Sequence, residues 1–251
     1  MMPPRDWNAA SYERMSAPLE AMGRDVLDRL DLRGDERVLD AGCGTGRVTA
    51  ALVQRVPRGE VVAVDGSPAM VEEARRRLGD SAEVFAADLL ELELDRPVDA
   101  ILSTATFHWI KDHDRLFERL LDALEPGGRL VAQCGGAGNV AELDRAAKLV
   151  GAQEPYAHAL KGWEGPWNFA SPDETTERLQ RLGWVDVWTW LHDVRVEPDD
   201  PREYLGTVAL GSHIERLEPD LREPFVDAVI AELAEPVVDY VRLNILARRR
   251  S

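Results

Sequence analysis

The sequence predicts an α/β protein, with a doubly wound, Rossmann-like sheet of seven mostly parallel strands and an antiparallel hairpin at one edge. Two observations support this fold class. Short aliphatic runs alternate with helical patterns through the first half of the chain. Continuous apolar runs of about four to six residues indicate strands that are covered on both faces. Turn and capping residues also stand where the helices should begin or end, so the local signals agree with the alternating pattern.

The first expected element is an amphipathic helix over residues 17–30, because its apolar residues recur with a helical spacing of about 3.6 residues. Strands should follow at residues 37–41, 61–65, 82–86, 99–103 and 129–134. The helices between them should occupy residues 45–56, 68–78 and 112–124. Ser67 and Pro68 form an N-cap followed by a first-turn proline. Gly127 and Gly128 end the later helix and turn the chain into the fifth strand.

The second half of the chain has long connections between its last strands. The expected elements are a helix over 171–182, a strand over 184–194, a mostly helical segment over 198–235 and a final strand over 237–247. This order predicts the antiparallel edge hairpin. We interpret residues 1–251 as one domain, whose core comprises about 20–134, 171–194 and 237–247. Helical inserts at about 135–170 and 195–236 should cover the active site.

The composition limits the kinds of partner and compartment. The chain has 251 residues and a formal net charge of −16, and a surface this acidic disfavours nucleic acid and membrane surfaces as partners. The polar N-terminal segment and the absence of a long apolar run favour a cytoplasmic protein. The two cysteines, Cys43 and Cys134, are too few for a structural zinc site, so we expect no metal. Both should be small buried residues rather than nucleophiles.

A glycine-rich turn follows the first predicted strand and should approach a ligand. Asp40 precedes the turn, which carries glycines at Gly42, Gly44 and Gly46. Glycines let the backbone come close to a cofactor, and the N-terminus of the next helix offers free N–H donors. A dinucleotide fingerprint would need another glycine where Arg47 stands, so the spacing argues against a nicotinamide dehydrogenase.

Two further acidic residues follow the next two predicted strands. Asp65 stands about 20 residues beyond the glycine turn, where a carboxylate can accept hydrogen bonds from both ribose hydroxyls. Asp88, with Leu89 beside it, follows the third strand and could meet the edge and face of an adenine. For each carboxylate alone, a helix N-cap or a solvated turn is the alternative. Their common place at the carboxyl ends of parallel strands favours a ligand site.

Four segments together resemble the successive motifs of the class I S-adenosylmethionine-dependent methyltransferases: VLDAGCGTGR, VVAVDGSPAMVEEAR, FAADL and LEPGGRL. The resemblance covers at least residues 20–134 and implies S-adenosylmethionine as the cofactor, with S-adenosylhomocysteine as product. It implies that Asp40 and the turn Gly42–Gly46 hold the methionine end, Asp65 the ribose, and Asp88 with Leu89 the adenine. The full implied cofactor set is Tyr12, Asp40, Gly42, Cys43, Gly44, Gly46, Asp65, Gly66, Met70, Asp88, Leu89 and Ser103.

A narrower similarity involves the run Ser103–Ile110, which resembles the trans-aconitate methyltransferases; the segments Trp7–Tyr12 and Tyr204–Thr207 resemble that group as well. The resemblance implies methyl transfer to a carboxylate oxygen of a small molecule, with Tyr12 over the cofactor. Methyltransferases that act on malonyl carrier protein share a similar run. Transfer to O, N or C of an apolar natural product or a carrier-bound acyl group therefore stays open, as does a non-catalytic cofactor-binding regulator.

The acceptor should lie against Thr106, His108, Trp109, Trp163 and Trp167. The tryptophans suit an apolar or planar acceptor at least as well as a tricarboxylate. The insert at 135–170 offers it few cations: Arg145, Lys148 and Lys161. Arg242 in the last strand is a further candidate, with a surface arginine as the more frequent alternative.

His108 is the candidate catalytic residue, as a general base or as a hydrogen-bond donor to the acceptor. A carboxylate acceptor needs no base because it is already ionised at neutral pH. The alternative is a histidine packed against Trp109 as part of the pocket wall. His113, one helical turn further on, is expected to face solvent.

Overall fold

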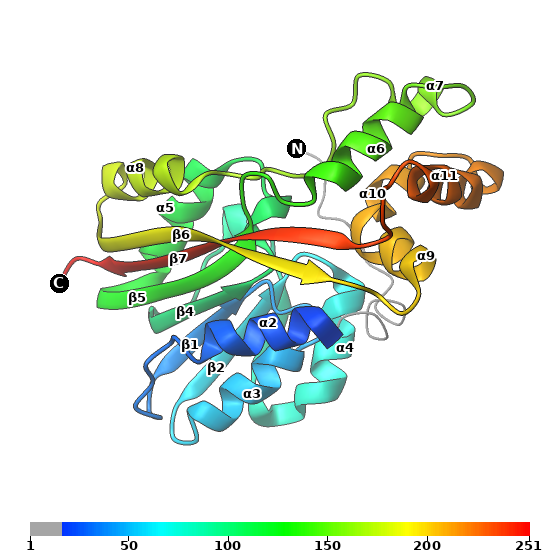
Figure 1. Ribbon diagram of the computed structural model, residues 1–251. Helices are drawn as coiled ribbons and strands as arrows, with labels where there is room; N and C mark the ends of the chain where they lie inside the picture. The colour runs from blue at the N-terminus through cyan, green and yellow to red at the C-terminus, as the bar shows by residue number, and fades with distance from the viewer. Residues whose placement is uncertain (1–16) are drawn as a thin grey trace.

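The computed structural model describes residues 17–251 (Figure 1). The predicted contact between Tyr12 and the cofactor therefore lies outside the described residues, as does the segment Trp7–Tyr12.

The described residues contain one sheet of seven strands in the order β3-β2-β1-β4-β5-β7-β6. The strands are β1 Arg37–Ala41, β2 Glu60–Asp65, β3 Glu83–Ala86, β4 Val98–Thr104, β5 Leu124–Gly135, β6 Trp184–Val196 and β7 Val238–Arg249. β1 to β5 are parallel, and β7 runs antiparallel to both β5 and β6. The structure thus confirms the predicted, mostly parallel sheet with an antiparallel edge hairpin. The strand order reverses beside β1, and open α/β sheets bind ligands at such a switch point.

Helices cover both faces of the sheet. They are α2 Ala17–Leu27, α3 Arg47–Arg55, α4 Pro68–Leu78, α5 His113–Ala123 and α8 Pro172–Arg181. Buried residues of α2 and α3 pack with β1 and β4 on one face, and those of α5 and α8 pack on the other face. The first turn of α4 forms as predicted, with the Ser67 hydroxyl accepting the backbone N–H of Met70 at 3.3 Å. The helix predicted over 45–56 begins at Arg47, because Gly46 takes a left-handed conformation before it.

Two groups of helices lie beyond the ends of the parallel strands (Figure 1). They are α6 Ala141–Gly151, α7 Ala157–Leu160, α9 Pro201–Tyr204, α10 Gly211–Ile214 and α11 Pro219–Ala231, with a π-helical turn η4 at Leu205–Ala209. Side chains from both predicted inserts form one apolar cluster, separate from the clusters of the sheet. The inserts therefore pack on each other at the carboxyl end of the sheet. Three short 3₁₀ turns complete the elements: η1 Gly79–Ser81, η2 Leu89–Glu91 and η3 Phe107–Trp109.

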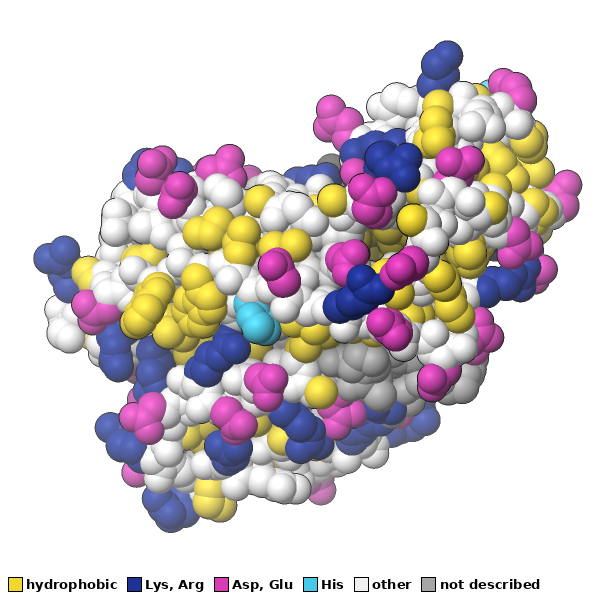
Figure 2. All heavy atoms as spheres, viewed as in Figure 1, with side chains coloured by type: hydrophobic (Ala, Val, Ile, Leu, Met, Phe, Trp, Pro, Cys, Tyr) yellow, Lys and Arg dark blue, Asp and Glu magenta, His cyan; other side chains and the backbone are white. Residues whose placement is uncertain are grey.

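The surface has few large exposed apolar side chains. Among the described residues these are Leu149, Trp188 and Leu191, and two of them belong to the edge strand β6. In Figure 2, acidic and basic side chains are scattered over the visible face, and apolar side chains gather along β6 beside a histidine. No helix in the described part is long and apolar enough to cross a membrane.

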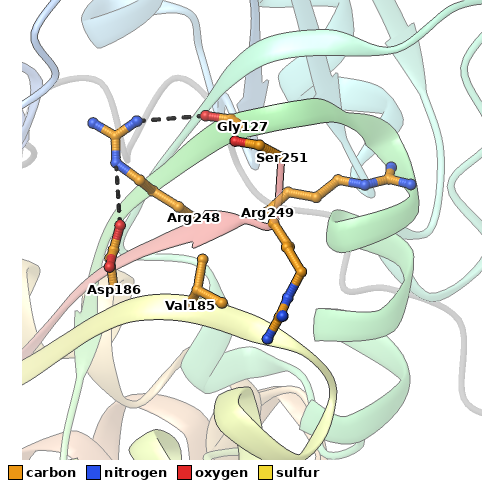
Figure 3. Close-up of a pocket in the computed structure, with 7 residues that line it drawn as sticks. Gly127, Val185, Asp186, Arg248, Arg249 and Ser251 are labelled. Atoms are coloured by element: carbon orange, nitrogen blue, oxygen red, sulfur yellow. Dashed lines mark hydrogen bonds and ion pairs between the residues drawn. The ribbon is translucent and has the colours of Figure 1, made fainter.

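The amino end of the sheet carries a groove of about 580 Å³ (Figure 3). Its lining residues are Gly127, Val185, Asp186, Arg248, Arg249, Arg250 and Ser251. Two of its arginines are engaged in the fold. Arg248 donates to the carbonyl of Gly127 at 3.4 Å, and Arg249 donates to the carbonyl of Leu121 at 3.0 Å. The groove lies at the opposite end of the sheet from the glycine turn.

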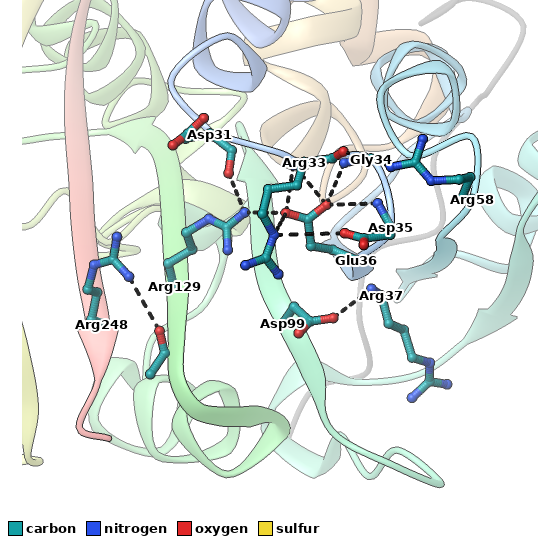
Figure 4. A network of polar contacts seen from close by, with 11 residues as sticks. Asp31, Arg33, Gly34, Asp35, Glu36, Arg37, Arg58, Asp99, Arg129 and Arg248 are labelled. Carbon is teal, nitrogen blue, oxygen red and sulfur yellow. Dashed lines mark hydrogen bonds and ion pairs between the residues drawn. The ribbon is translucent and has the colours of Figure 1, made fainter.

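A polar network closes the same end of the sheet (Figure 4). The buried carboxylate of Glu36 accepts the backbone N–H groups of Arg33, Gly34 and Asp35 at 2.8–3.2 Å. It also accepts a hydrogen bond from Arg129 at 3.0 Å. Burial opposes ionisation of Glu36, but these hydrogen bonds outweigh it and lower the pKa of the carboxyl to about 2. The network ties the loop before β1 to β5.

Candidate active site

The glycine turn forms at the carboxyl end of β1, as predicted. Gly42, Gly44 and Gly46 have φ of 91°, 52° and 78°, in the region that favours glycine. A Cβ on Gly42 would come within 2.1 Å of the Thr106 hydroxyl oxygen, so a side chain there would clash with the turn after β4. A Cβ on Gly44 would meet nothing within 4 Å among the described atoms. The backbone at Gly44 therefore faces open space at the switch point.

Asp40 is almost completely enclosed beneath this turn, with 1% of its surface exposed. Its Oδ2 accepts the Thr49 hydroxyl at 2.7 Å. Its Oδ1 is buried and has no hydrogen-bond partner within residues 17–251. Burial raises the pKa of Asp40 to about 7, and the hydrogen bond from Thr49 offsets only part of that effect. A buried carboxyl oxygen without a donor is the kind of atom that a cationic or N–H-bearing ligand would satisfy.

Asp65 lies at the end of β2, next to the glycine turn. Its carboxylate accepts the backbone N–H of Gly44 and that of Ser67, each at 2.9 Å. Burial still raises the pKa of Asp65, against these hydrogen bonds and one from the N–H of Gly66. The structure thus brings Asp40, Asp65 and the turn together at one edge of the sheet.

The other residues predicted for the cofactor lie at the same edge or behind it. Asp88 is half-buried and caps η2 by accepting the N–H of Leu90 at 2.9 Å, and Leu89 beside it is buried. Met70 is buried in the first turn of α4. Ser103 is buried too, and its hydroxyl donates to the carbonyl of Ala41 at 2.6 Å, which ties β4 to β1.

The two cysteines are buried. Burial raises the pKa of Cys43 well above its usual range and that of Cys134 to about 12. Both side chains are therefore held as neutral thiols at physiological pH.

His108 lies in η3, just beyond the end of β4, and is buried. Its Nδ1 accepts the backbone N–H of Gly135 at 3.2 Å, so the proton of the neutral ring belongs on Nε2. Burial, followed by the positive charge of Arg242, lowers its pKa well below the usual range. The ring packs on Trp109 and on Phe169, with centroids 5.0 and 5.9 Å apart. The arrangement makes His108 a neutral hydrogen-bond donor within an aromatic wall.

The expected exposure of His113 is wrong. The residue is 4% exposed, and its Nε2 donates to the carbonyl of Phe107 at 2.9 Å. It lies on the face of α5 that also buries Leu116 and Phe117, because positions three and four residues apart share one side of a helix. Burial lowers the pKa of His113.

Arg242 is also buried, with 2% of its surface exposed, so the alternative of a surface arginine is wrong. It stands opposite Gly135 in the pairing of β5 with β7, and its Nε donates to the side-chain oxygen of Gln133 at 3.5 Å. Its guanidinium lies over the ring of Tyr240 at 5.3 Å, and the hydroxyl of Tyr240 is 2.8 Å from that of Tyr204. The structure thus places a cation beside His108 and two phenols near that cation.

The aromatic wall continues from His108 into the inserts. Trp167 stacks on Phe169 at 5.4 Å and lies 6.2 Å from Trp109. His213, from the second insert, is 5.6 Å from Trp167 and 4.8 Å from Trp163. Trp109 and Trp167 are therefore close to His108, whereas Trp163 contacts His213 of the same group.

Other residues predicted for the acceptor have structural contacts. Thr106 donates to the carbonyl of Gly42 at 3.2 Å and so braces the glycine turn. Arg145 pairs with Glu142 at 3.1 Å and Lys148 with Asp144 at 2.6 Å on the surface of α6. These two cations of the insert are thus paired with carboxylates of their own helix. No group of three or more potential metal ligands comes together in the described part of the chain.

The sequence interpretation missed four residues of this site: Gln133, Phe169, His213 and Tyr240. Phe169 and His213 belong to the inserts, whereas Gln133 and Tyr240 each contact Arg242. A tryptophan-rich insert hinted at Phe169, but the other three carried no local signal.

Comparisons with known proteins agree on one family. A family model described as a methyltransferase domain matches residues 38–128. The trans-aconitate 2-methyltransferase of Methylobacterium nodulans is 31% identical over 258 residues, which cover 97% of this chain and 98% of that protein. The enzyme of the same name from Escherichia coli O1:K1 is 38% identical over 128 residues, covering 51% of this chain and 50% of that protein.

Solved structures share the fold at lower identity. Phosphoethanolamine N-methyltransferase 2 of Haemonchus contortus, solved with phosphomonomethylethanolamine and S-adenosylhomocysteine, superposes with a TM-score of 0.65 at 18% identity. The match covers 97% of this chain and 57% of that protein. A geranyl diphosphate methyltransferase solved with its diphosphate and sinefungin gives a TM-score of 0.55 at 20% identity, covering 91% of this chain and 77% of that one.

Proposed function

This chain belongs to the S-adenosylmethionine-dependent methyltransferases, and on that premise we propose that it methylates a carboxylate oxygen of a small polycarboxylate of the trans-aconitate type. The buried cation Arg242, beside His108 at the carboxyl end of the sheet, is the observation that carries the proposal. A guanidinium can hold a carboxylate through paired, charge-assisted hydrogen bonds, so a buried arginine beside His108 suits an acceptor carboxylate.

The residues at the glycine turn fit the cofactor. S-adenosylmethionine supplies an activated methyl group on a sulfonium, together with an ammonium group and a ribose. Asp40 has a buried oxygen able to accept a hydrogen bond, and both Asp40 and Asp65 have raised pKa values. A cation nearby stabilises the charged form of each carboxylate. We assign the methionine end to Asp40 and the turn Gly42–Gly46, the ribose to Asp65, and the adenine to Asp88 and Leu89.

The acceptor then lies between Arg242, His108 and the aromatic wall. Arg242 neutralises one carboxylate, and the Nε2 proton of His108 donates to the acceptor and orients it. A carboxylate is ionised at neutral pH, so its oxygen can attack without a general base. The rings of Trp109, Trp167 and Phe169 exclude water, and alignment of the two reactants then lowers the barrier.

The aromatic wall also favours a second candidate, a planar apolar acceptor or a carrier-bound acyl group. Such an acceptor would stack on Trp167 and Phe169, whose ring planes are inclined by 18°. The relatives named trans-aconitate 2-methyltransferase favour a carboxylate acceptor, which is why we place this candidate second.

A screen with methyl-labelled cofactor separates the two candidates. Trans-aconitate and other small polycarboxylates are compared with phenols, amines and acyl carrier protein esters. We expect label in polycarboxylates as a base-labile methyl ester. Label in phenols or amines, and none in carboxylates, would overturn the proposal.

The Arg242→Gln variant tests the anion contact. Losing one partner of a buried charge pair should raise KM for the polycarboxylate by roughly 30-fold or more, while cofactor affinity stays within about twofold. Arg145→Gln, on the outer side of α6, is the matched control. Equal effects of both substitutions would contradict the assigned role.

A further inference from the structure

Residues 163–170 of the first insert carry Trp167 and Phe169 of the aromatic wall, yet they form neither helix nor strand. Such a segment has no hydrogen-bonded ladder of its own, so other groups must hold its backbone. Here these groups belong to residues 108–111, which comprise the end of η3 and the loop after it. The contacts between the two segments therefore also decide where the wall lies relative to His108.

Asn168 joins the middle of this segment to the chain around η3. Its backbone N–H donates to the carbonyl of His108 at 2.8 Å. Its side-chain amide donates to the carbonyl of Ile110 at 3.3 Å and to that of Lys111 at 3.0 Å. An amide has two N–H donors, so it can serve both carbonyls. Because Asn168 stands between the two aromatic residues of the segment, these contacts hold both rings close to η3.

Lys111 makes the contacts in the opposite direction, from the loop after η3 to the insert. Its Nζ donates to the carbonyl of Trp167 at 2.6 Å and to that of Gly165 at 3.3 Å. Hydrogen bonds from an ammonium group are stronger than those between neutral groups. Gly165 is buried, and a backbone carbonyl in such a place needs a donor. The exposed side chain of Lys111 thus fixes the backbone on both sides of residue 166.

The rings alone would not fix one position of the wall. Trp167 lies 6.2 Å from Trp109 and 5.4 Å from Phe169, and the Phe169 ring lies 5.9 Å from that of His108. Aromatic pairs are favourable in several orientations with centroids about 4.5–7 Å apart, so ring contacts permit more than one arrangement. Hydrogen bonds are directional, and those described above select one of these arrangements.

We propose that Lys111 and Asn168 are positioning residues for methyl transfer, which hold Trp167 and Phe169 beside His108 before the acceptor binds. The inference rests on the proposed place of the acceptor against this wall. Lys111 and Asn168 act through the wall rather than by touching the acceptor. If the wall is ordered only part of the time, the apparent affinity for the acceptor falls by the ordered fraction. Holding the wall in place therefore lowers the acceptor KM, whereas kcat depends on it less, because the bound acceptor itself orders the wall.

Steady-state kinetics of Lys111→Met with trans-aconitate test this role, because methionine has a similar length but no N–H donor. We expect the KM for trans-aconitate to rise roughly three- to tenfold, with kcat and the calorimetric affinity for S-adenosylmethionine within about twofold of wild type. Lys111→Arg keeps a charged donor and should recover most of the loss. Lys148→Met is the matched control, since Lys148 pairs with Asp144 of its own helix. Circular dichroism checks that each variant is folded. A KM that Lys111→Met leaves within twofold of wild type would overturn the proposal.

Hydrogen–deuterium exchange tests the same contacts without an acceptor. Peptides that cover residues 163–170 should exchange faster in Lys111→Met than in wild type, because local opening becomes easier, and Lys148→Met should exchange like wild type. Unchanged exchange in Lys111→Met would also overturn the proposal. A wild-type protein that does not methylate trans-aconitate would instead contradict the proposed function. The KM comparison is then made with the phenol, amine or acyl carrier protein ester that the screen labels, and the same two results decide the role of Lys111.

Discussion

At the residue scale, two acidic side chains beside the glycine turn are held where burial opposes their charge. Asp40 and Asp65 both have pKa values raised by burial. The folded chain therefore bears an energetic cost at this site that a bound cation can relieve. Function and stability are opposed there, as is common where a protein keeps a charge ready for a ligand.

The Asp40→Asn variant should separate the effect of the Asp40 charge on stability from its effect on cofactor binding. The pKa of Asp40 is about 7 in the folded protein, against a usual value of 3.8, so ionisation costs about 4 kcal/mol above pH 7. The variant should be more stable by up to about that amount near pH 8. The gain should shrink as pH falls below 7 and vanish near pH 4, because the folded state then retains the proton. Urea unfolding at several pH values measures it.

Cofactor affinity of the same variant should fall by about tenfold or more, because a charged hydrogen bond is lost. Calorimetry with S-adenosylmethionine measures this loss. A variant no more stable than wild type near pH 8 would contradict the cost assigned to Asp40.

Asp65→Asn tests the assigned ribose contact. The amide keeps an oxygen to accept the N–H of Gly44 or Ser67, so the turn should remain folded. Loss of the charge should weaken S-adenosylmethionine binding by roughly 10- to 100-fold. Asp80→Asn, an exposed carboxylate in η1, is the control. Unchanged affinity would show that another group holds the ribose.

The position of a single site residue was predictable where it followed from the neighbouring sequence. Asp40, Gly42 and Asp65 follow strands at fixed spacings, so their common position at the sheet edge was visible in the sequence. Arg242 was not, because its burial depends on pairing with a strand whose Gln133 is 109 residues away. The pattern that buries His113 was local, but a single polar residue on an apolar helix face gave no sign of its hydrogen bond.

At the scale of elements, cross-strand pairing decides where β5 begins. Predicted strands and helices agree with the structure to within a few residues, because apolar runs and capping residues are local. β5 is the exception. It begins at Leu124 rather than at residue 129, because Leu124 already pairs with Val98 before an irregularity in the register. Cross-strand pairing decides such bounds, and the sequence does not display it.

Glu36→Gln should show how much the network at the amino end stabilises β1. The pKa of Glu36 is about 2 in the folded protein, against 4.5 as its usual value, so its charge stabilises the fold by about 3 kcal/mol above pH 4.5. The variant should lose up to about that amount at neutral pH. The difference from wild type should narrow as pH falls below about 4.5, since the unfolded state then takes up the proton.

Chemical denaturation of Glu36→Gln and of wild type measures the difference, with the exposed Glu125→Gln as control. Equal losses of stability in both variants would show that the hydrogen bonds of Glu36 do not stabilise the fold more than an exposed carboxylate does.

At the scale of the whole molecule, the sheet brings distant segments to one edge and leaves another edge open. The site combines β1, β2 and β4 with both inserts, and β7 contributes Arg242 between β5 and β6. The order of the expected elements predicted a mostly parallel sheet with an antiparallel edge hairpin, and the structure adds the order of its strands. It could not predict which faces the inserts present to each other, because their apolar cluster forms only when both are folded.

The buried histidines should make the stability of the whole fold sensitive to mild acid. Burial lowers the pKa of His108 and of His113, so below about pH 6.5 the unfolded chain binds protons that the folded chain does not. Each such proton lowers the free energy of unfolding by about 1.4 kcal/mol per pH unit. Asp40 acts in the opposite direction over the same range, because its pKa is raised to about 7. Asp65, whose pKa is also raised, acts in the same direction as Asp40, so single-residue variants are needed to measure what each histidine contributes.

His113→Gln isolates one of these contributions. A glutamine amide can still donate to the carbonyl of Phe107 but cannot take up a proton. As pH falls from about 6.5 to 5, the free energy of unfolding of the variant should fall less steeply than that of wild type. The difference should be up to about 1.4 kcal/mol per pH unit, the effect of one proton. The exposed His192→Gln is the matched control. Urea unfolding curves across this range give the slope directly, and identical slopes for His113→Gln and wild type would show that His113 titrates alike in both states.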